Sequence, residues 1–313
     1  MVPVVVGQSE ERFAEYAGRQ GFTLQPGQLG RGVRLSAWRY IHASVKGTGH
    51  ETTGQPCQDH HAVKLIETGR DEPLLLLVTS DGAGSAAHSE EGSAAVCEET
   101  LRWLEMRLSD GTAFLTEADG VSLVHNLRTY LLNYAEEPER QYAVRDLACT
   151  LNVAAVLPQR AWFLQVGDGA VIVQSGSSPM EVVFWPDNGE YANQTYFVTD
   201  VPDDRIHTRI VESELDRLSL MTDGLLSLAL VFQQRSVHAP FFESMFRGVE
   251  ALDGVDTGAY GQLQAGLSRF LNSPGVNART SDDKTLILAS QRPPVKAVPI
   301  QAVAATPGEG VTS

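Results

Sequence analysis

Residues 74–85 read LLLLVTSDGAGS, and they are the most informative part of the sequence for the fold. The apolar run 74–78 predicts a short buried strand. Asp81 and Gly82 follow it closely, and the residues after them are small. The stretch therefore predicts a carboxylate held at the end of a rigid strand, next to a backbone that a ligand can approach closely.

The same order of residues recurs where an apolar run leads through a threonine into Asp223 and Gly224. Asp282 stands shortly before another apolar run, and Asp59 directly precedes one more. Carboxylate oxygens are the ligands that Mg²⁺ and Mn²⁺ prefer, and strand ends hold them in fixed geometry. These residues favour a divalent-metal site, although Asp-Gly is also a common turn dipeptide.

Two glycine-containing segments have other interpretations. Residues 82–87, GAGSAA, fit the G-x-G-x-x-A fingerprint of dinucleotide-binding proteins. Asp81 argues against that function, because it would place a negative charge beside the pyrophosphate. Residues 167–169, Gly-Asp-Gly with Asp168 at the centre, predict a turn that joins two strands into a hairpin.

Hydrophobic periodicity predicts strands in runs and helices in pairs. A helix is expected to begin at Ser89, because apolar residues spaced three and four apart follow it as far as Leu108. This arrangement favours an α+β fold with largely antiparallel sheets over a doubly wound sheet. Further helices are predicted at residues 121–134, 241–252 and 260–271. Strands are predicted at residues 38–45, 60–66, 74–78, 147–157, 161–166, 170–174, 181–185, 196–199, 205–211, 217–221 and 284–289.

The 313 residues are expected to form one catalytic domain with two extensions. Residues 1–30 are predicted to be an N-terminal extension that contains a short helix, and residues 31–290 the domain. Residues 291–313 are rich in Pro, Ala, Val and Gly without periodicity, which predicts a flexible tail.

Composition excludes several classes of partner. The chain has 24 Lys and Arg against 39 Asp and Glu, a formal charge of −15, which argues against nucleic acid or an anionic membrane. An acidic cleft would favour divalent cations, whereas an acidic surface can also serve solubility alone. The 3 cysteines lack zinc-ligand spacing and fit a reducing cytoplasm. No apolar stretch approaches the roughly 18 residues that span a bilayer.

Taken together, the motifs resemble the metal-dependent protein serine/threonine phosphatases of type 2C, particularly their divergent bacterial branch. The resemblance covers residues 36–290 and depends on the order of the segments rather than on any one of them. The segments are GTGH at 47–50 with PCQD at 56–59, SDGAGS at 80–85, ACTL at 148–151 with GDG at 167–169, TDG at 222–224, and DDKTL at 282–286.

The resemblance implies a four-layer sandwich of two mainly antiparallel β-sheets flanked by helices. It also implies two Mn²⁺ or Mg²⁺ ions bridged by Asp81, with a third, looser ion near Asp168. A metal-bound hydroxide would attack phosphorus in line, with no covalent enzyme intermediate. The implied catalytic residues are His50, Asp59 and Asp81. The implied metal ligands are Asp59, Asp81, Gly82, Asp168, Asp223 and Asp282.

The chain departs from the family pattern at three positions. Gln58 replaces a glutamate and is a poorer ligand. No arginine lies near Gly54 to bind phosphate, for which His50 is a substitute. Ala83 stands where some relatives carry a histidine, which leaves a metal-bound water or His88 to protonate the leaving oxygen.

The first functional hypothesis is a phosphatase that acts on phosphoserine or phosphothreonine in proteins, with a cognate Ser/Thr kinase or its target as a partner. The three departures support an alternative, a catalytically weak or inactive phosphatase-like scaffold that binds a signalling partner. A third hypothesis is a metal-dependent hydrolase of small phosphoesters.

Overall fold

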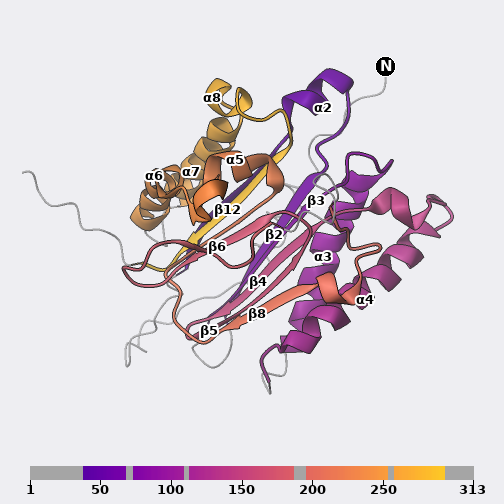
Figure 1. Cartoon of the computed structure of the whole chain (residues 1–313), viewed down its shortest axis with the longest axis horizontal. Coiled ribbons are helices and arrows are strands. Elements are labelled where there is room, and N and C mark those ends of the chain that lie inside the picture. Colours follow the sequence, from indigo (N-terminus) through magenta and orange to yellow (C-terminus); the bar gives the residue numbers. More distant parts are fainter. Residues whose placement is uncertain (1–37, 68–72, 109–112, 187–194, 253–256, 293–313) are drawn as a thin grey trace, which may run out of the picture. The chain divides into compact units, whose positions relative to one another are not determined.

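The computed structural model describes residues 38–67, 73–108, 113–186, 195–252 and 257–292 (Figure 1). The expected extension at residues 1–30 lies outside the described residues, as does the expected tail beyond residue 292. Both boundaries of the catalytic domain therefore stay predictions.

Two five-stranded sheets form the centre of the described structure, and all their neighbouring strands are antiparallel. In sheet I the order is β2 (Asp59–Glu67), β3 (Pro73–Asp81), β4 (Leu151–Leu157), β5 (Arg160–Val166) and β8 (His207–Val211). In sheet II the order is β1 (Arg39–Val45), β12 (Lys284–Ser290), β9 (Arg217–Met221), β6 (Ala170–Gln174) and β7 (Glu181–Val182).

The apolar run of β3 is buried on both faces, as the sequence predicts. Leu74 and Leu76 pack into the core beneath the helices that cover sheet I, whereas Leu75 and Leu77 pack against sheet II. Side chains alternate across a strand, so a continuous apolar run supplies both cores at once. Each fully buried leucine contributes about 1.5–3 kcal/mol of transfer free energy.

Helices cover the outer face of each sheet. α3 (Ser89–Leu108) and α4 (Glu117–Ala135) pack on sheet I, and α6 (Ala239–Ala251) and α7 (Thr257–Leu271) pack on sheet II. The resulting helix–sheet–sheet–helix order confirms the predicted four-layer α+β fold. The short elements are α2 (Thr48–Thr53), α5 (Leu226–Ala229), α8 (Pro274–Asn277), β10 (Leu230–Val231), β11 (Ser236–Val237), and the 3₁₀ turns η1 (Val144–Leu147), η2 (Asp203–Arg205), η3 (Asp223–Leu225) and η4 (Phe232–Gln234).

The predicted hairpin at residues 167–169 is wrong. β5 belongs to sheet I and β6 to sheet II, so the Gly-Asp-Gly segment carries the chain from one sheet to the other. Gly167 makes this crossing possible with a φ of 94°, a conformation that residues with a side chain avoid. β6 pairs with β9 instead of β5, and this contact is invisible to local sequence patterns.

Three predicted strands are shorter than expected, and a fourth is absent. The strand expected at 205–211 begins at His207, because residues 203–205 form η2. The strand expected at 147–157 begins at Leu151, because residues 144–147 form η1 and Cys149 makes only an isolated bridge to Gly82. The strand expected at 181–185 ends at Val182. The segment 196–199 is no strand, since Phe197 accepts turn hydrogen bonds from the amides of residues 200 and 201.

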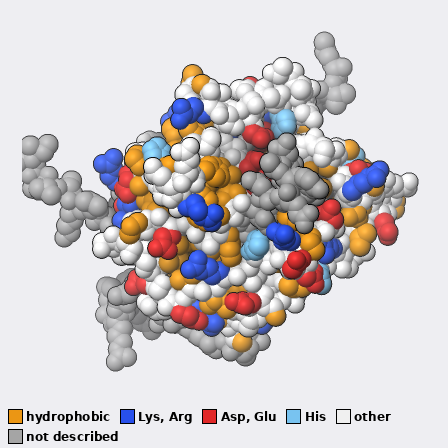
Figure 2. Space-filling view, in the orientation of Figure 1, with side chains coloured by type: hydrophobic (Ala, Val, Ile, Leu, Met, Phe, Trp, Pro, Cys, Tyr) orange, Lys and Arg blue, Asp and Glu red, His pale blue; other side chains and the backbone are white. Residues whose placement is uncertain are grey.

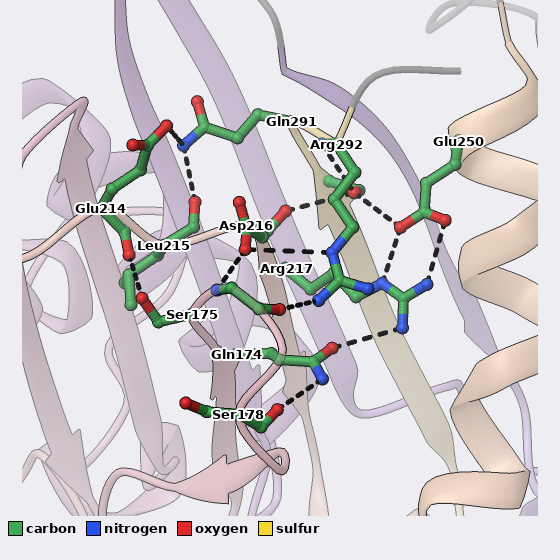
Figure 3. A network of polar contacts seen from close by, with 12 residues as sticks. Gln174, Ser175, Ser178, Glu214, Leu215, Asp216, Arg217, Glu250, Gln291 and Arg292 are labelled. Carbon is green, nitrogen blue, oxygen red and sulfur yellow. Dashed lines mark hydrogen bonds and ion pairs between the residues drawn. The ribbon is translucent and has the colours of Figure 1, made fainter. Parts of the chain in front are cut away.

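A buried ion pair fastens α6 to sheet II at the Arg217 end of β9 (Figure 3). Arg217 donates from Nε and Nη2 to the two carboxylate oxygens of Glu250, at 2.6 and 2.9 Å. Ser290 of β12 donates to the same carboxylate at 3.1 Å.

In the described ranges, no helix is both long and apolar enough to cross a bilayer.

Candidate active site

The acidic residues singled out in the sequence meet at one end of the two sheets. Asp59 at the start of β2 lies directly opposite Asp81 at the end of β3. Asp223 follows β9 and Asp282 precedes β12, its neighbour in sheet II. Figure 2 shows acidic side chains gathered beside a histidine near the α2 end of the molecule. Asp81, Asp223 and Asp282 line a common cavity of about 170 Å³.

The backbone around Asp81 is clamped to the neighbouring strand. The Asp81 amide donates to Thr150 Oγ1 at 3.0 Å, and the Thr150 amide donates to the Asp81 carbonyl at 2.8 Å. Ser80 Oγ donates to the Thr150 carbonyl at 2.6 Å. Thr150 therefore acts as a structural hydroxyl and fixes the backbone position of Asp81.

Two glycines bring separate loops against the segment that carries Asp282. A Cβ on Gly224 would lie 2.0 Å from the Asp283 carbonyl oxygen, and a Cβ on Gly47 would lie 2.3 Å from the Asp282 carbonyl carbon. Any side chain at these positions would push the loops apart. The Gly47 amide also donates to Asp283 Oδ1 at 2.6 Å.

Asp59 is 5% exposed and sits beside Asp81 rather than on the cavity wall. Thr222 Oγ1 donates to Asp59 Oδ2 at 2.7 Å, and the Thr285 amide in turn donates to Thr222 Oγ1 at 3.0 Å. Burial raises the pKa of Asp59 to about 8, although the neighbouring Thr222 and Thr285 side chains lower it in part. Asp59 is therefore a carboxylate that lacks a compensating positive charge.

The carboxylates of Asp81 and Asp223, which line the cavity, also lack a compensating positive charge. Burial raises the pKa of Asp81 well above its usual range, and the charges of Asp59 and Asp223 add to the rise. Burial also raises the pKa of Asp223 to about 6, with contributions from Asp168 and Asp282. Negative charges buried around one cavity repel one another unless a cation lies between them.

Unpartnered oxygens support the presence of that cation. Asp59 Oδ1, Asp223 Oδ1 and Gln58 Oε1 are buried and make no hydrogen bond within the described structure. A buried acceptor without a partner costs about 1–3 kcal/mol. Oxygen-only ligands of this kind suit Mg²⁺ or Mn²⁺.

The carboxylates do not converge on a single point. Of the residues that the structure describes, only His88, Glu90 and Glu91 bring three potential donor atoms within 4.8 Å of one another. Both carboxylate oxygens of Glu91 already accept hydrogen bonds from tyrosine hydroxyls, from Tyr134 at 3.0 Å and from Tyr142 at 2.9 Å. Mg²⁺ keeps several waters, so each ion in the cavity needs only a few protein oxygens.

The other predicted residues take separate positions. His50 of α2 lines the cavity, and its Nδ1 lies 2.9 Å from Asp283 Oδ2. Asp168 also lines the cavity and accepts from Thr195 Oγ1 at 2.6 Å. His88 does not line the cavity but stacks on a tyrosine ring 3.6 Å away, so its expected role in protonation is not supported.

Sequence reasoning missed three residues that hold the site together. Asp283 accepts from the amides of Gly47 and Gln58 and contacts His50, and Thr222 and Thr285 hold Asp59. Asp283 stands next to a predicted ligand and Thr222 belongs to the repeated strand-end pattern, so both were within reach of the sequence. Nothing local to Thr285 indicates its partner.

Comparison with known proteins agrees with this geometry. Residues 46–272 match the family model for protein phosphatase 2C. The chain is 34% identical over 254 residues to serine/threonine-protein phosphatase 3 of Escherichia coli, across 81% of this chain and 98% of that protein.

Solved structures show the same fold. Serine/threonine phosphatase Stp1 from Staphylococcus aureus superposes with a TM-score of 0.51 at 17% identity, covering 86% of this chain and 99% of that one. A bacterial serine phosphatase gives a TM-score of 0.50 at 17% identity, covering 81% and 98%. By its sequence match over more than half its length, the chain belongs to the protein phosphatase 2C family.

Proposed function

We propose that this protein is a Mn²⁺- or Mg²⁺-dependent phosphatase that hydrolyses phosphoserine or phosphothreonine in proteins. The observation that carries the proposal is a cavity lined by Asp81, Asp223 and Asp282 beside buried oxygens that lack partners. Family membership supports the reaction class. When bound, the ions would supply an activated water and polarise the phosphoryl group.

The residues divide the work by position. Asp81, whose backbone is hydrogen-bonded to Thr150, would hold the ions from sheet I, and Asp223 and Asp282 would hold them from the facing sheet. We assign the remaining ligand oxygens to Asp59, the Gly82 carbonyl and, for a third ion, Asp168. Held in this geometry, the carboxylates would place a water for in-line attack on phosphorus without a covalent enzyme intermediate.

His50 is the proposed contact to the phosphate. It is the only side chain on the cavity wall, within the described ranges, that can carry a positive charge. Its Nδ1 is engaged by Asp283, which leaves Nε2 for the substrate. It would thus substitute for the arginine that the family places near Gly54.

The proposed substrate is a phosphorylated protein, with a cognate Ser/Thr kinase or its target as a partner. A cytoplasmic location is proposed because Cys57, Cys97 and Cys149 are free thiols. The family match does not favour the alternative of an inactive scaffold.

The proposal is tested by hydrolysis of an aryl phosphate with Mn²⁺, with EDTA, and by an Asp81→Asn variant. Loss of the bridging ligand is expected to reduce the rate on the order of a thousandfold, about 4 kcal/mol of transition-state stabilisation. Asp204→Asn, an exposed carboxylate away from the cavity, is the matched control and retains full activity.

Absence of turnover at every metal concentration, in a protein that remains folded, would favour the scaffold. A preference for phosphopeptides over small phosphoesters separates the protein phosphatase from a small-molecule hydrolase.

A further inference from the structure

A row of polar side chains crosses the space between the two sheets, where their edge strands β1 and β2 face each other. His42 Nδ1 lies 2.6 Å from His61 Nε2, and His61 Nδ1 lies 2.7 Å from Ser44 Oγ. Ser44 Oγ in turn lies 2.6 Å from Thr285 Oγ1. The Thr285 amide donates to Thr222 Oγ1 at 3.0 Å, and Thr222 Oγ1 donates to Asp59 Oδ2 at 2.7 Å, so these four residues, the inter-sheet row, lead to the metal site.

The contacts of the inter-sheet row allow either direction of donation, because each hydroxyl can donate or accept and a neutral histidine has two tautomers. The amide nitrogen of Gln264, which only donates, also lies 3.3 Å from His42 Nδ1.

The outer end of the row is fixed by α7. The His42 amide donates to Gln264 Oε1 at 3.1 Å, and Gln264 Nε2 donates to the His42 carbonyl. One glutamine side chain therefore holds both polar groups of the His42 backbone. This grip fixes the first histidine, from which the rest of the row is aligned.

The surroundings show why such a row calls for a function. Apolar side chains such as Leu75, Leu77 and Ile287 fill much of the space between the sheets. Polar groups in such a layer are costly unless all of them are satisfied. A continuous chain of hydrogen bonds strengthens each bond through polarisation of the next.

We propose that the inter-sheet row positions the Asp59 carboxylate and thereby sets how tightly the protein binds its divalent metal. The inference rests on the proposed function, because it takes Asp59 to be part of the metal site. His42, His61, Ser44 and Thr285 act as positioning residues, since none of them lines the cavity. Hydrogen bonds behind a metal ligand tune its orientation and affinity in the same way in other metal sites.

The test is calorimetric titration of the metal-free full chain with Mn²⁺. Ser44→Ala removes the central hydroxyl and is expected to weaken binding roughly tenfold, the lower end of the usual cost of losing such a partner. Stoichiometry stays at the wild-type value. Ser44→Thr keeps the hydroxyl in a strand that tolerates threonine, and it restores affinity to within about twofold.

Ser290→Ala is the matched control, because it removes a buried hydroxyl from the opposite end of β12. It lowers the unfolding temperature but leaves Mn²⁺ affinity unchanged. If Ser44→Ala does not fold, His42→Phe severs the outermost link and is expected to weaken binding by a smaller factor, about threefold.

Mn²⁺ binding by the wild type and by the variants distinguishes a failure of the proposed function from a failure of the inter-sheet row. A wild-type protein that binds no Mn²⁺ overturns the proposed function together with this proposal. Normal wild-type binding with unchanged affinity in Ser44→Ala or His42→Phe overturns the inter-sheet row alone.

Discussion

Gln58 occupies the cavity with an uncharged oxygen where the family pattern has a carboxylate. Its backbone is rigid, since its amide donates to Asp283 Oδ2 at 2.5 Å and its carbonyl accepts from Gly82 and Ser93. The side chain is 4% exposed and its Oε1 has no partner among the described residues. The Gln58 side chain therefore offers an oxygen at the cavity wall, and this oxygen carries no charge.

Replacement of Gln58 by glutamate is expected to tighten Mn²⁺ binding about tenfold, because the new ligand adds one negative charge at nearly the same position. Isothermal calorimetry of the metal-free protein measures the effect. Gln55→Glu, on the exposed turn before β2, is the matched control for a general charge effect. Equal tightening in both variants would contradict a ligand role for Gln58.

At the scale of elements, the sequence predicts best what depends on neighbouring strands. Asp59 and Asp81 could be paired from the sequence because β2 and β3 follow each other, and antiparallel neighbours place the start of one opposite the end of the next. Asp168 could not be placed in this way, since its flanking glycines fit both a hairpin and a crossing between sheets. The pairing of β6 with β9 decided the outcome.

The inter-sheet row lay beyond sequence reasoning for the same reason. Ser44 and Thr285 are 241 residues apart, and their contact exists only because β1 and β12 pair in sheet II. His61 was correctly predicted as a strand residue, but its partners belong to the other sheet. Local patterns thus locate ligands, whereas the residues that support them depend on topology.

The anchorage of α6 gives a prediction with a pH dependence. Burial on its own would raise the pKa of Glu250, but hydrogen bonds and the charge of Arg217 outweigh burial, and the pKa is lowered. The unfolded chain then takes up this proton first as pH falls. The contribution of the ion pair is therefore complete above the unfolded pKa, and it is lost as pH falls through the folded pKa.

Glu250→Gln is expected to reduce the free energy of unfolding by about 3 kcal/mol at pH 7, because it breaks a buried ion pair. The difference from wild type shrinks as the pH is lowered below about 4, the ordinary glutamate range. Urea unfolding at several pH values measures both effects. Glu243→Gln, whose carboxylate is 46% exposed, serves as the control and should cost less than about 1 kcal/mol.

At the scale of the whole molecule, the metal site is a centre of strain in the metal-free protein. Buried carboxylates from both sheets repel one another, and no lysine or arginine from the described residues lines the cavity between them. A cation binds the folded protein but finds no such cluster in the unfolded chain. Metal binding and folding are therefore linked.

Saturation with Mn²⁺ at a hundred times its dissociation constant is expected to stabilise the fold by about 2.7 kcal/mol per site. For a domain of this size that corresponds to a rise in unfolding temperature of roughly 5–10 °C, measured by scanning calorimetry with and without EDTA. Asp81→Asn should lose most of this rise, yet its metal-free form should unfold at a higher temperature than the metal-free wild type. An unfolding temperature of the wild type that does not change with Mn²⁺ would contradict the linkage between metal binding and folding.

Asp59 and Asp81 belong to sheet I, whereas Asp223 and Asp282 flank strands of sheet II. Layers that meet mainly through apolar side chains can slip past each other in small shear steps. Ions coordinated by residues of both sheets would hold the two sheets in one relative position. The rate at which the ions exchange would then report how freely the two sheets slide past each other.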